Sequence, residues 1–219
     1  ALRAADLGRE VMLIEERERP GGTCLLDGCI PSKTLIQAVG LVSATREAER
    51  FGLSFEGVRI DVDRLRAFTS EVVTGLSDGI KALLARRGVT VLHGTARFRG
   101  PDLLAVDGGA EVKFRHCIVA TGSRPRTLPV AADLGLWTST EALALASVPE
   151  RLVVVGGGYI GLELGLVYAG LGSAVTVVEF MPELLVGADP DLVKPVLDHA
   201  ETVLAAIRTG TRVLGVERT

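Results

Sequence analysis

One short unit occurs twice in this sequence. Residues 1–16 align with residues 165–180 at a constant offset of 164 positions, with six identical pairs. These pairs are Leu2 with Leu166, Ala5 with Ala169, Leu7 with Leu171, Gly8 with Gly172, Val11 with Val175 and Glu15 with Glu179. In each copy an alanine- and leucine-rich helix is predicted to end at a left-handed glycine, and a short aliphatic strand then ends in a carboxylate. The pattern indicates an α/β fold built from two similar halves.

A glycine-rich loop precedes the helix of the second copy. Leu152–Val155 is typical of a buried strand, and Gly156–Gly161 follows it with the spacing GxGxxG. Glu179 comes 18 residues after Gly161, close to the separation expected between a phosphate-binding loop and a ribose-binding acid. An ordinary glycine-rich turn is the alternative. The strand before the loop and the helix after it favour a dinucleotide-binding βαβ unit.

The residue types in this loop suit a dinucleotide. Gly156 permits the tight turn, Gly158 lets the backbone approach a pyrophosphate, and Gly161 allows close contact of helix and strand. The helix N-terminus supplies unpaired N–H groups to the phosphates. Glu179 would bind the adenosine ribose hydroxyls and repel a 2′-phosphate, which favours NAD over NADP. The predicted NAD-binding residues are Gly156, Gly158, Tyr159, Ile160, Gly161 and Glu179.

The same offset places the glycine loop of the first copy upstream of Ala1. We therefore expect this chain to be a fragment that lacks the first strand and loop of that copy. Glu15 would then be the ribose-binding acid of a second dinucleotide site, with Glu16 beside it as a solvated side chain.

Two cysteines, Cys24 and Cys29, stand five residues apart in a glycine-flanked stretch between the two copies. A structural disulfide, half of a zinc site and two inert buried thiols are the alternatives to redox chemistry. The remaining Cys and His residues lack zinc-site spacing, so we predict no metal; they are Cys117, His93, His116 and His199. A disulfide closing so short a loop would add little stability. A redox-active pair therefore fits best.

Pro31 suits the first turn of a helix that continues through Leu35. Such a helix would place Cys29 near its positive N-terminal end, which favours the thiolate form. Cys24, expected on a loop, would stay more accessible to another thiol. The two sulfurs are therefore expected to have different roles.

Charge and composition exclude several classes of partner. The net charge is −3, which gives no long-range attraction to nucleic acid or to anionic lipid. No stretch approaches about 18 uninterrupted apolar residues, so we expect no membrane span. Three cysteines in 219 residues are too few for a disulfide scaffold and favour a reducing, cytoplasmic location.

Three segments together carry a family resemblance. They are GGTC…GCIPSK over residues 21–33, VVVGGGYIGLELG over residues 153–165, and Cys117–Pro125. In order and over essentially the whole chain, they resemble the dihydrolipoamide dehydrogenases, flavin-dependent pyridine nucleotide–disulfide oxidoreductases. Glutathione and mercuric reductases share the broader resemblance.

The resemblance implies roles for particular residues. Cys24 would be the interchange thiol that attacks the substrate disulfide, and Cys29 the charge-transfer thiol against the flavin of FAD. Lys33 would lie near the flavin N5 and pair with Glu163, and Tyr159 would cover the flavin ring as a gate for nicotinamide. Surface charges, and a packing role for the tyrosine, are the alternatives. The further FAD-binding residues would be Glu15, Gly22, Thr23, Ala120, Thr121 and Gly122, whereas Cys117 is expected in the core.

The implied reaction is FAD-dependent oxidation of protein-bound dihydrolipoamide, with reduction of NAD to NADH and a role in cell redox homeostasis. The implied partners are the lipoyl domain of a 2-oxoacid dehydrogenase or glycine-cleavage complex and a second copy in a homodimer. Mercuric or glutathione-type reductases, and a non-catalytic nucleotide-binding module, are the alternatives. Glu179 argues against the NADP-dependent reductases, because those relatives need basic residues at this position. Residues 180–182 offer no basic side chain either.

Two departures from the family matter. Leu26 and Asp27 replace the usual Asn and Val between the cysteines, and a carboxylate there should disfavour the thiolate and shift the redox poise. The chain also stops at Thr219, before the motif whose His–Glu pair would act as acid–base in the partner subunit. We therefore expect the isolated chain to be inactive.

The predicted architecture is two incomplete Rossmann-like domains of the three-layer ββα type. Residues 1–148 would form the FAD-binding domain and residues 149–219 the start of the NAD-binding domain. Between the two copies, Asp61–Arg87 is predicted as a long amphipathic helix capped by Gly88. Strands are predicted at residues 89–98, 103–106 and 111–119.

Overall fold

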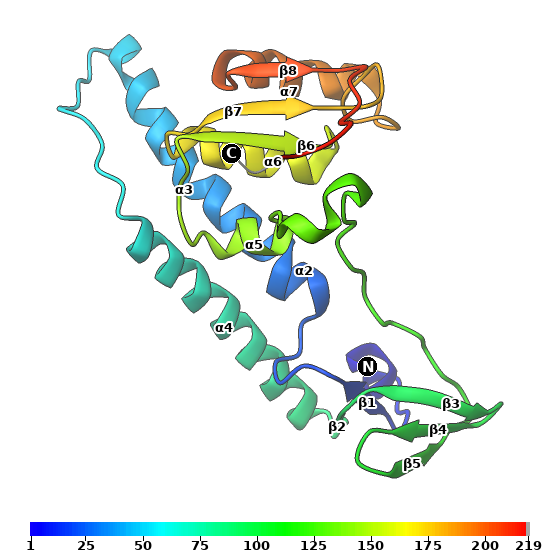
Figure 1. The fold of residues 1–219 in the computed structure, drawn as a ribbon. Coiled ribbons are helices and arrows are strands. Elements are labelled where there is room, and N and C mark those ends of the chain that lie inside the picture. Colours follow the sequence, from blue (N-terminus) through cyan, green and yellow to red (C-terminus); the bar gives the residue numbers. More distant parts are fainter. Residues whose placement is uncertain (218–219) are drawn as a thin grey trace. The chain divides into compact units, whose positions relative to one another are not determined.

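The computed structural model describes residues 1–217, apart from the side chains of residues 132 and 133. The chain divides into two compact units (Figure 1). The first contains Ala1–Leu26 and Val73–Ser123, and the second contains Asp27–Val72 and the chain from Arg124 onward. The predicted domain boundary after Val148 does not coincide with these divisions and stays a prediction. Thr219, where the predicted NAD-binding domain ends, lies outside the described residues.

The first unit contains two small sheets. Strands β1 (Met12–Glu15) and β2 (Thr90–His93) pair in parallel after the short helix α1 (Leu2–Asp6). Strands β3 (Ala96–Gly100), β4 (Leu103–Val106) and β5 (Ala110–Lys113) form an antiparallel sheet. Helix α2 (Gly22–Asp27) begins in this unit.

Two of the strand predictions need correction. The predicted strand 89–98 is two strands, because Gly94 adopts a φ of +147° and the chain leaves β1 to pair with β4 instead. The predicted strand 111–119 ends at Lys113. Within residues 1–217 no strand pairs with residues 115–119, so their N–H and C=O groups have no ladder to join. Cys117 is consequently exposed rather than in the core. The strand predicted at 103–106 is confirmed.

Helix α4 (Val62–Arg86) confirms the long helix predicted at residues 61–87. The carboxylate of Asp61 accepts a hydrogen bond from the backbone N–H of Arg64 at 2.9 Å, which caps the start of the helix. Gly88 follows the helix with a φ of +64°, and the N–H of Val89 reaches back to the carbonyl of Leu84 at 3.0 Å. The predicted glycine cap is therefore present.

The second unit is a parallel sheet covered by helices. Its strands are β6 (Arg151–Val155), β7 (Ala174–Val178) and β8 (Ala206–Arg208), in that spatial order. Its helices are α3 (Cys29–Glu47), the 3₁₀ helices η1 (Ala48–Phe51) and η2 (Pro129–Leu134), α5 (Ser139–Ala144), α6 (Tyr159–Gly170) and α7 (Pro190–Val203). The predicted α/β class is confirmed.

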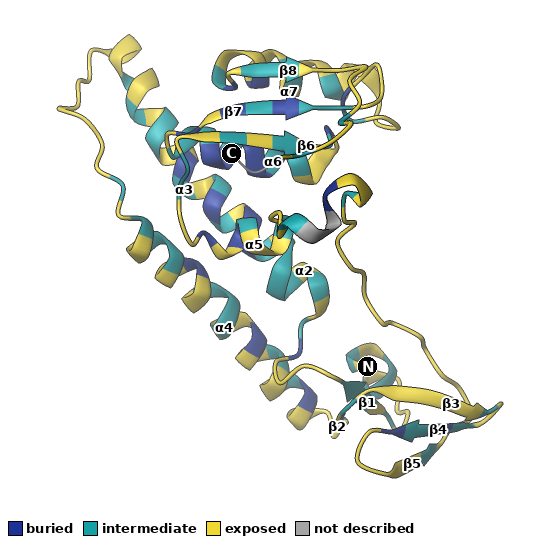
Figure 2. Ribbon diagram, in the orientation of Figure 1, coloured by how far each residue is buried: buried dark blue, intermediate teal, exposed yellow. Residues whose placement is uncertain are grey.

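Helix α6 is the centre of this unit. A Cβ atom on Gly165 would make ordinary contacts of 3.6 to 3.8 Å with side chains of β6 and β7. A Cβ on Gly170 would come within 2.8 Å of Val39 in α3. One face of α6 therefore lies on the sheet and another against α3, and five of its residues are buried (Figure 2). The core also contains Leu35, Val175, Val177 and Tyr168.

Trp137, the only tryptophan of the chain, lies beside this core. Its ring centroid is 6.1 Å from that of Tyr168, at an interplanar angle of 45°. The hydroxyl of Tyr168 donates a hydrogen bond of 2.8 Å to the carbonyl of Ala142 in α5. The tyrosine thus joins α6 to α5 from the interior.

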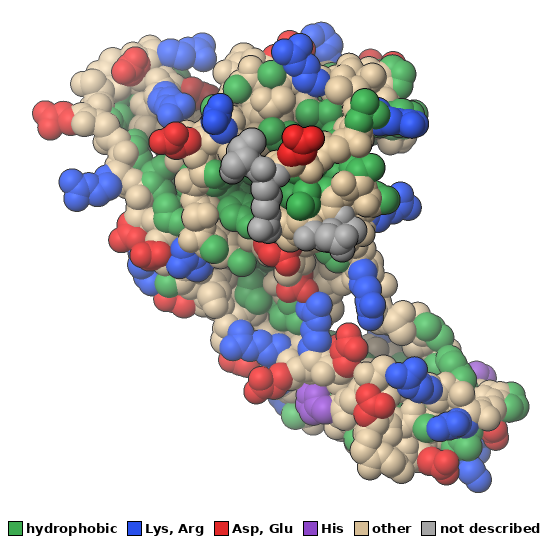
Figure 3. Space-filling view, viewed as in Figure 1, with side chains coloured by type: hydrophobic (Ala, Val, Ile, Leu, Met, Phe, Trp, Pro, Cys, Tyr) green, Lys and Arg blue, Asp and Glu red, His purple; other side chains and the backbone are tan. Residues whose placement is uncertain are grey.

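Charges and hydropathy bear on possible partners. On the face seen in Figure 3, acidic and basic side chains are interspersed. Among the described residues, one helical run, Gly22–Phe51, is long and apolar enough by composition to cross a membrane. Core helices of soluble proteins pass the same test, and Leu35 and Val39 of this run are buried in the core. The expectation of no membrane partner stays a prediction.

Candidate functional site

The glycine loop between β6 and α6 has the predicted geometry. Gly156 adopts a φ of +111°, and its N–H donates a hydrogen bond of 2.8 Å to the carbonyl of Val178. A Cβ on Gly161 would overlap the carbonyl oxygen of Gly156, so only glycine fits there. Gly158 is the N-cap of α6, and a Cβ placed on it would meet no atom within 4 Å. The loop therefore combines a tight turn, a close helix contact and an open backbone surface.

Glu179 is fixed by the backbone of the same loop. Its Oε2 accepts a hydrogen bond from the N–H of Gly157 at 2.6 Å, and its Oε1 accepts one from the N–H of Met181 at 2.6 Å. Each carboxylate oxygen keeps a second lone pair for a ligand hydroxyl. The acid is thus held at the carboxyl end of β7 with acceptor capacity to spare.

Gly157 is a site residue that the sequence did not single out. A Cβ on this residue would overlap the side chain of Leu184 and lie 3.1 Å from the Cβ of Glu179. The GxGxxG spacing leaves this position open to any residue, so only the unbroken run of three glycines could have indicated it. Here glycine brings the N–H close enough to hold the Glu179 carboxylate.

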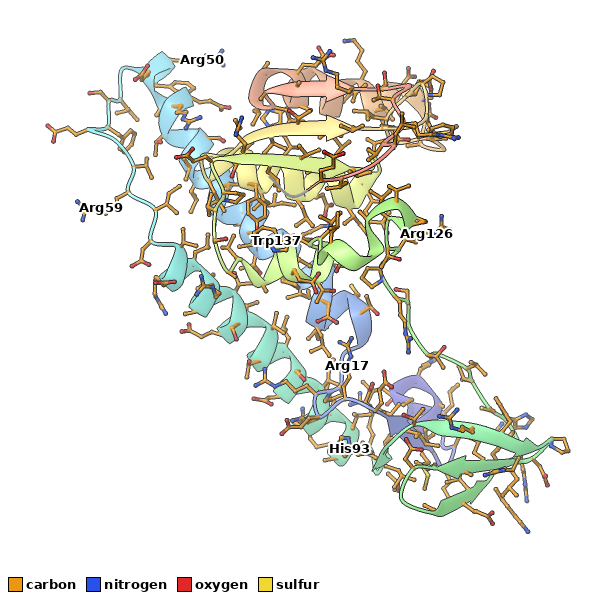
Figure 4. The ribbon with its side chains drawn as sticks, viewed as in Figure 1. Arg17, Arg50, Arg59, His93, Arg126 and Trp137 are labelled. Carbon is orange, nitrogen blue, oxygen red and sulfur yellow. The ribbon has the colours of Figure 1, made fainter. Side chains whose placement is uncertain are left out.

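The acid of the first copy has a matching contact. Glu15 ends β1, and its Oε1 accepts a hydrogen bond from the N–H of Arg17 at 3.1 Å. Residues 17 and 181 correspond at the offset of 164, so both acids bind the N–H two residues later. His93 of β2 pairs with Glu15 of β1, and the Nδ1 of its ring lies 3.2 Å from the carbonyl oxygen of Arg17 (Figure 4).

A second group of predicted residues meets between α3 and α6. The Nζ of Lys33 lies 2.6 Å from Oε1 and 2.8 Å from Oε2 of Glu163, with side-chain exposures of 57% and 29%. The predicted pairing of these residues is therefore present. Ser32, which sequence reasoning missed, is buried beside them, with its hydroxyl 3.3 Å from Oε2 of Glu163 and 3.2 Å from the carbonyl of Cys29. In the sequence, only the position of Ser32 next to Lys33 could have indicated that it belongs to this site.

The structure places Cys24 and Cys29 on successive helices. Cys29 is the first residue of α3 after the N-cap Gly28, as predicted from Pro31, and its side chain is exposed. Cys24 lies in α2 rather than on the expected loop, because the chain turns into a helix after Gly22, whose φ is +64°. Cys24 is also exposed. The two cysteines belong to different compact units, and their pairing stays a prediction.

Two segments predicted to border a flavin meet within the first unit. A Cβ on Gly122, whose φ is +77°, would lie 3.2 Å from the Oγ1 of Thr23. Ala120 and Thr121 precede this contact as exposed residues without regular structure. This contact brings together, within the first unit, the two segments that are predicted to border the flavin.

Tyr159 is the first residue of α6 and is 68% exposed, which argues against a packing role. Ile160 beside it is also exposed. Both lie at the helix end where the first N–H groups have no intrahelical partner. The position suits a side chain that covers a ligand rather than one that fills the core.

A cavity of about 240 Å³ opens beside Glu179. Its lining includes Gly156, Phe180 and Arg212, and the guanidinium carbon of Arg212 lies 4.9 Å from the centroid of the Phe180 ring. The sequence had indicated no basic residue near Glu179, because Arg212 comes from a separate segment after β8. Elsewhere in the described part of the chain, no three His, Cys, Asp or Glu residues form a group that could hold a metal ion.

Comparison with protein families gives a match over the whole chain. The family of pyridine nucleotide-disulphide oxidoreductases matches residues 1–219. This chain belongs to that family. Among curated members it is 42% identical to the dihydrolipoyl dehydrogenase of Vibrio parahaemolyticus over 199 residues, which are 89% of this chain and 42% of the relative. It is 42% identical to that of Haloferax volcanii, over 92% of this chain and 44% of the relative.

The chain spans less than half the length of these relatives. The dihydrolipoyl dehydrogenase of Thermus scotoductus matches all of it at 40% identity, over 47% of the relative. Among solved structures, a Cu(II) complex of a HOCl-induced flavoprotein disulfide reductase from Escherichia coli has a TM-score of 0.82 and 27% identity. That match covers 100% of this chain and 47% of the other. The two Rossmann-like halves predicted from the repeat agree with this fold.

Proposed function

We propose that this chain belongs to a dihydrolipoyl dehydrogenase, which oxidises protein-bound dihydrolipoamide and reduces NAD to NADH with FAD as cofactor. The observation that supports it most is 40–42% identity to dihydrolipoyl dehydrogenases of bacteria and an archaeon, over 89% or more of this chain. Exposed Cys29, whose carbonyl accepts a hydrogen bond from the Ser32 hydroxyl beside the Lys33–Glu163 pair, gives that similarity a chemical basis.

The cysteines would accept the electron pair of the substrate. A thiolate of dihydrolipoamide attacks Cys24 in a Cys24–Cys29 disulfide, and the bond between the cysteines breaks with release of Cys29 as thiolate. The second substrate thiolate then attacks the mixed disulfide and releases lipoamide and the thiolate of Cys24. Cys29 suits the leaving role because it opens α3, where the helix dipole stabilises negative charge.

Several residues fit FAD. Bound FAD would accept the electron pair from the reduced cysteines and supply it for reduction of NAD. Thr23 and Gly122 bring together the two segments predicted to border the flavin, and Glu15 holds acceptor oxygens at the end of β1 for a ribose. Lys33 provides a positive charge whose position is set by both oxygens of Glu163.

NAD would occupy the second copy. The open backbone at Gly158 and the N-terminus of α6 suit the pyrophosphate, and Glu179 suits the ribose of the adenosine half. Exposed Tyr159 would cover the path of the nicotinamide. The proposal extends to a lipoyl domain of a 2-oxoacid dehydrogenase or glycine-cleavage complex as substrate, a homodimer, and a cytoplasmic location.

The direct test is NADH formation from dihydrolipoamide by the FAD-loaded protein that contains this sequence. We expect turnover that Cys24→Ser and Cys29→Ser each abolish and that Cys117→Ser, a matched control at an exposed cysteine outside the site, leaves unchanged. Reduction of glutathione disulfide or Hg(II) with NADPH, and no turnover of dihydrolipoamide, would instead support the mercuric and glutathione-type reductases.

A spectrum separates the roles of the two sulfurs. Long-wavelength thiolate–flavin absorption should persist in Cys24→Ser, because Cys29 remains beside the flavin, and should vanish in Cys29→Ser. The opposite pattern would reverse the assignment of the interchange and charge-transfer thiols without removing the redox pair.

A further inference from the structure

Arg212 introduces a positive charge into the cavity that contains the ribose-binding acid. The cavity lining combines Glu179 and Phe180 from the end of β7 with Arg212 from the segment that follows β8. The Arg212 guanidinium lies 4.9 Å from the centre of the Phe180 ring, the arrangement of a cation–π contact. The inference drawn from it rests on the proposed NAD site.

Arg212 forms no ion pair with the acid in this cavity. Both oxygens of Glu179 accept hydrogen bonds from backbone N–H groups, of Gly157 and Met181. Within residues 1–217, no ion pair joins Arg212 to a carboxylate. The side chain is exposed and has only the weak attraction of the Phe180 ring to hold it. It is therefore available to a ligand.

The size of the cavity limits which part of a ligand it takes. At about 240 Å³ it is smaller than the roughly 300–1,000 Å³ typical of sites for whole drug-sized ligands. It suits one nucleoside half of a dinucleotide. Glu179 and Arg212 both line it, so a ribose held by Glu179 would bring its hydroxyl-bearing carbons into a cavity with both charges.

We propose that Arg212 is a specificity-determining residue that offsets part of the discrimination exerted by Glu179 against a 2′-phosphate. Glu179 repels the phosphate dianion, whereas the guanidinium offers it a planar set of donors and a positive charge. NAD, which has only hydroxyls there, gains little from Arg212. The preference for NAD over NADP is therefore smaller than the acid alone would set.

The test is calorimetric titration of the full-length protein that contains this sequence with NAD and with NADP. Arg212→Gln should weaken NADP binding by roughly fivefold, the upper range for an exposed charge pair, and NAD binding by less than twofold. Arg212→Lys keeps the charge and should retain most of the NADP affinity. Arg151→Gln removes an equal charge at the start of β6, outside the cavity, and should leave the ratio of the two affinities unchanged.

Two results would overturn the inference. An equal loss of NAD and NADP affinity in Arg212→Gln would show that the guanidinium stacks on the shared adenine, and no change in either would show that it contacts neither ligand. Failure of the unaltered full-length protein to bind NAD at all would count against the proposed function itself. Added salt should shrink the effect of Arg212→Gln on NADP, since exposed charges are screened.

Discussion

The two copies of the repeat have the same backbone bonds and very different surroundings. In both, the helix ends in the same three hydrogen bonds at the offset of 164. They run from Leu7 to Arg3 and Leu171 to Val167, from Gly8 to Ala5 and Gly172 to Ala169, and from Arg9 to Ala4 and Ser173 to Tyr168. In each copy the carbonyl of the matching valine then accepts a hydrogen bond from the next strand region, Val11 from Thr90 and Val175 from Ala205.

Burial separates the two copies. Helix α1 has no buried residue, whereas α6 has five. The reason is the number of partners, because α6 has a sheet on one face and α3 on another, while α1 accompanies a two-stranded sheet. Local sequence therefore sets the hydrogen bonds of the unit, and its neighbours set how much apolar surface it buries. Most of the stability is expected in the second copy.

The largest expected effect is at a position where the second copy depends on close contact. In Gly161→Ala the new methyl group would overlap the Gly156 carbonyl, which is backbone and cannot swing away. We expect a loss of about 3 kcal/mol in the free energy of unfolding, the upper range for overpacking, together with loss of NAD binding. Denaturant unfolding followed by Trp137 fluorescence measures the first, and calorimetry the second.

Gly165→Ala is the matched control, one turn later in the same helix. Its methyl group would make only ordinary contacts of 3.6 to 3.8 Å with the sheet. Alanine is favoured over glycine inside a helix by roughly 0.5–1 kcal/mol, so this variant should be as stable as the parent or more so. If both variants lost the same stability, the close contact at Gly161 would not be the cause.

Much of this arrangement was predictable because it depends on local chemistry. Glycine after an apolar helix, aspartate before α4 and the GxGxxG spacing act through backbone geometry within a few residues. The same holds for Cys29, whose place at the start of α3 follows from Pro31. These features needed no knowledge of the tertiary fold.

The remaining features depend on residues far apart in the sequence. Residues 115–119 have a strand-like pattern, but a strand requires a partner, and Ile118 and Val119 are exposed without one in the part of the chain that is described. Gly157 and Ser32 matter only through contacts with Leu184 and Glu163. Arg212 reaches the cavity of Glu179 from a segment with no motif.

The glycines that end the two helices give a sharper comparison of the copies. Gly8 has a φ of +73°, near the left-handed region that Asn can adopt, whereas Gly172 has a φ of +113°, beyond it. Gly172→Asn should therefore cost about 1–2 kcal/mol, and Gly8→Asn clearly less. Denaturant unfolding reports the first change, and hydrogen exchange at Arg9 the second. Equal costs would show that the two turns are interchangeable.

Tyr168 corresponds to Ala4 in the first copy, and its buried side chain should contribute to the free energy of unfolding. Tyr168→Phe leaves the carbonyl of Ala142 without its donor and should cost about 1 kcal/mol. Burial raises the pKa of Tyr168 above its ordinary value of 10.0. The unfolded chain then loses the phenol proton at a lower pH than the folded chain, so the free energy of unfolding should fall as pH rises above about 10.

The phenylalanine variant provides the comparison for this pH dependence. It should lack the part of the decline that Tyr168 causes, which denaturant unfolding at pH 8 to 11 would measure. An identical decline in both proteins would place the titrating group elsewhere.

The smallest expected effect concerns the ion pair that joins the helix of each copy to another part of its unit. Lys33 joins Glu163 of α6 to α3 at 2.6 Å, and Arg87, just after α4, contacts Asp6 of α1 at 2.6 Å. All four side chains are partly exposed, so each pair should contribute only about 0.5 kcal/mol in a double-mutant cycle. Lys33→Met and Arg87→Met should therefore lower stability equally and slightly.

Only Lys33→Met should alter the flavin spectrum of the FAD-loaded protein, because the proposed function places only that charge beside the flavin. If Lys33→Met left the flavin spectrum unchanged and still caused the small loss of stability, the Lys33–Glu163 pair would have only a structural role, like the Arg87–Asp6 pair.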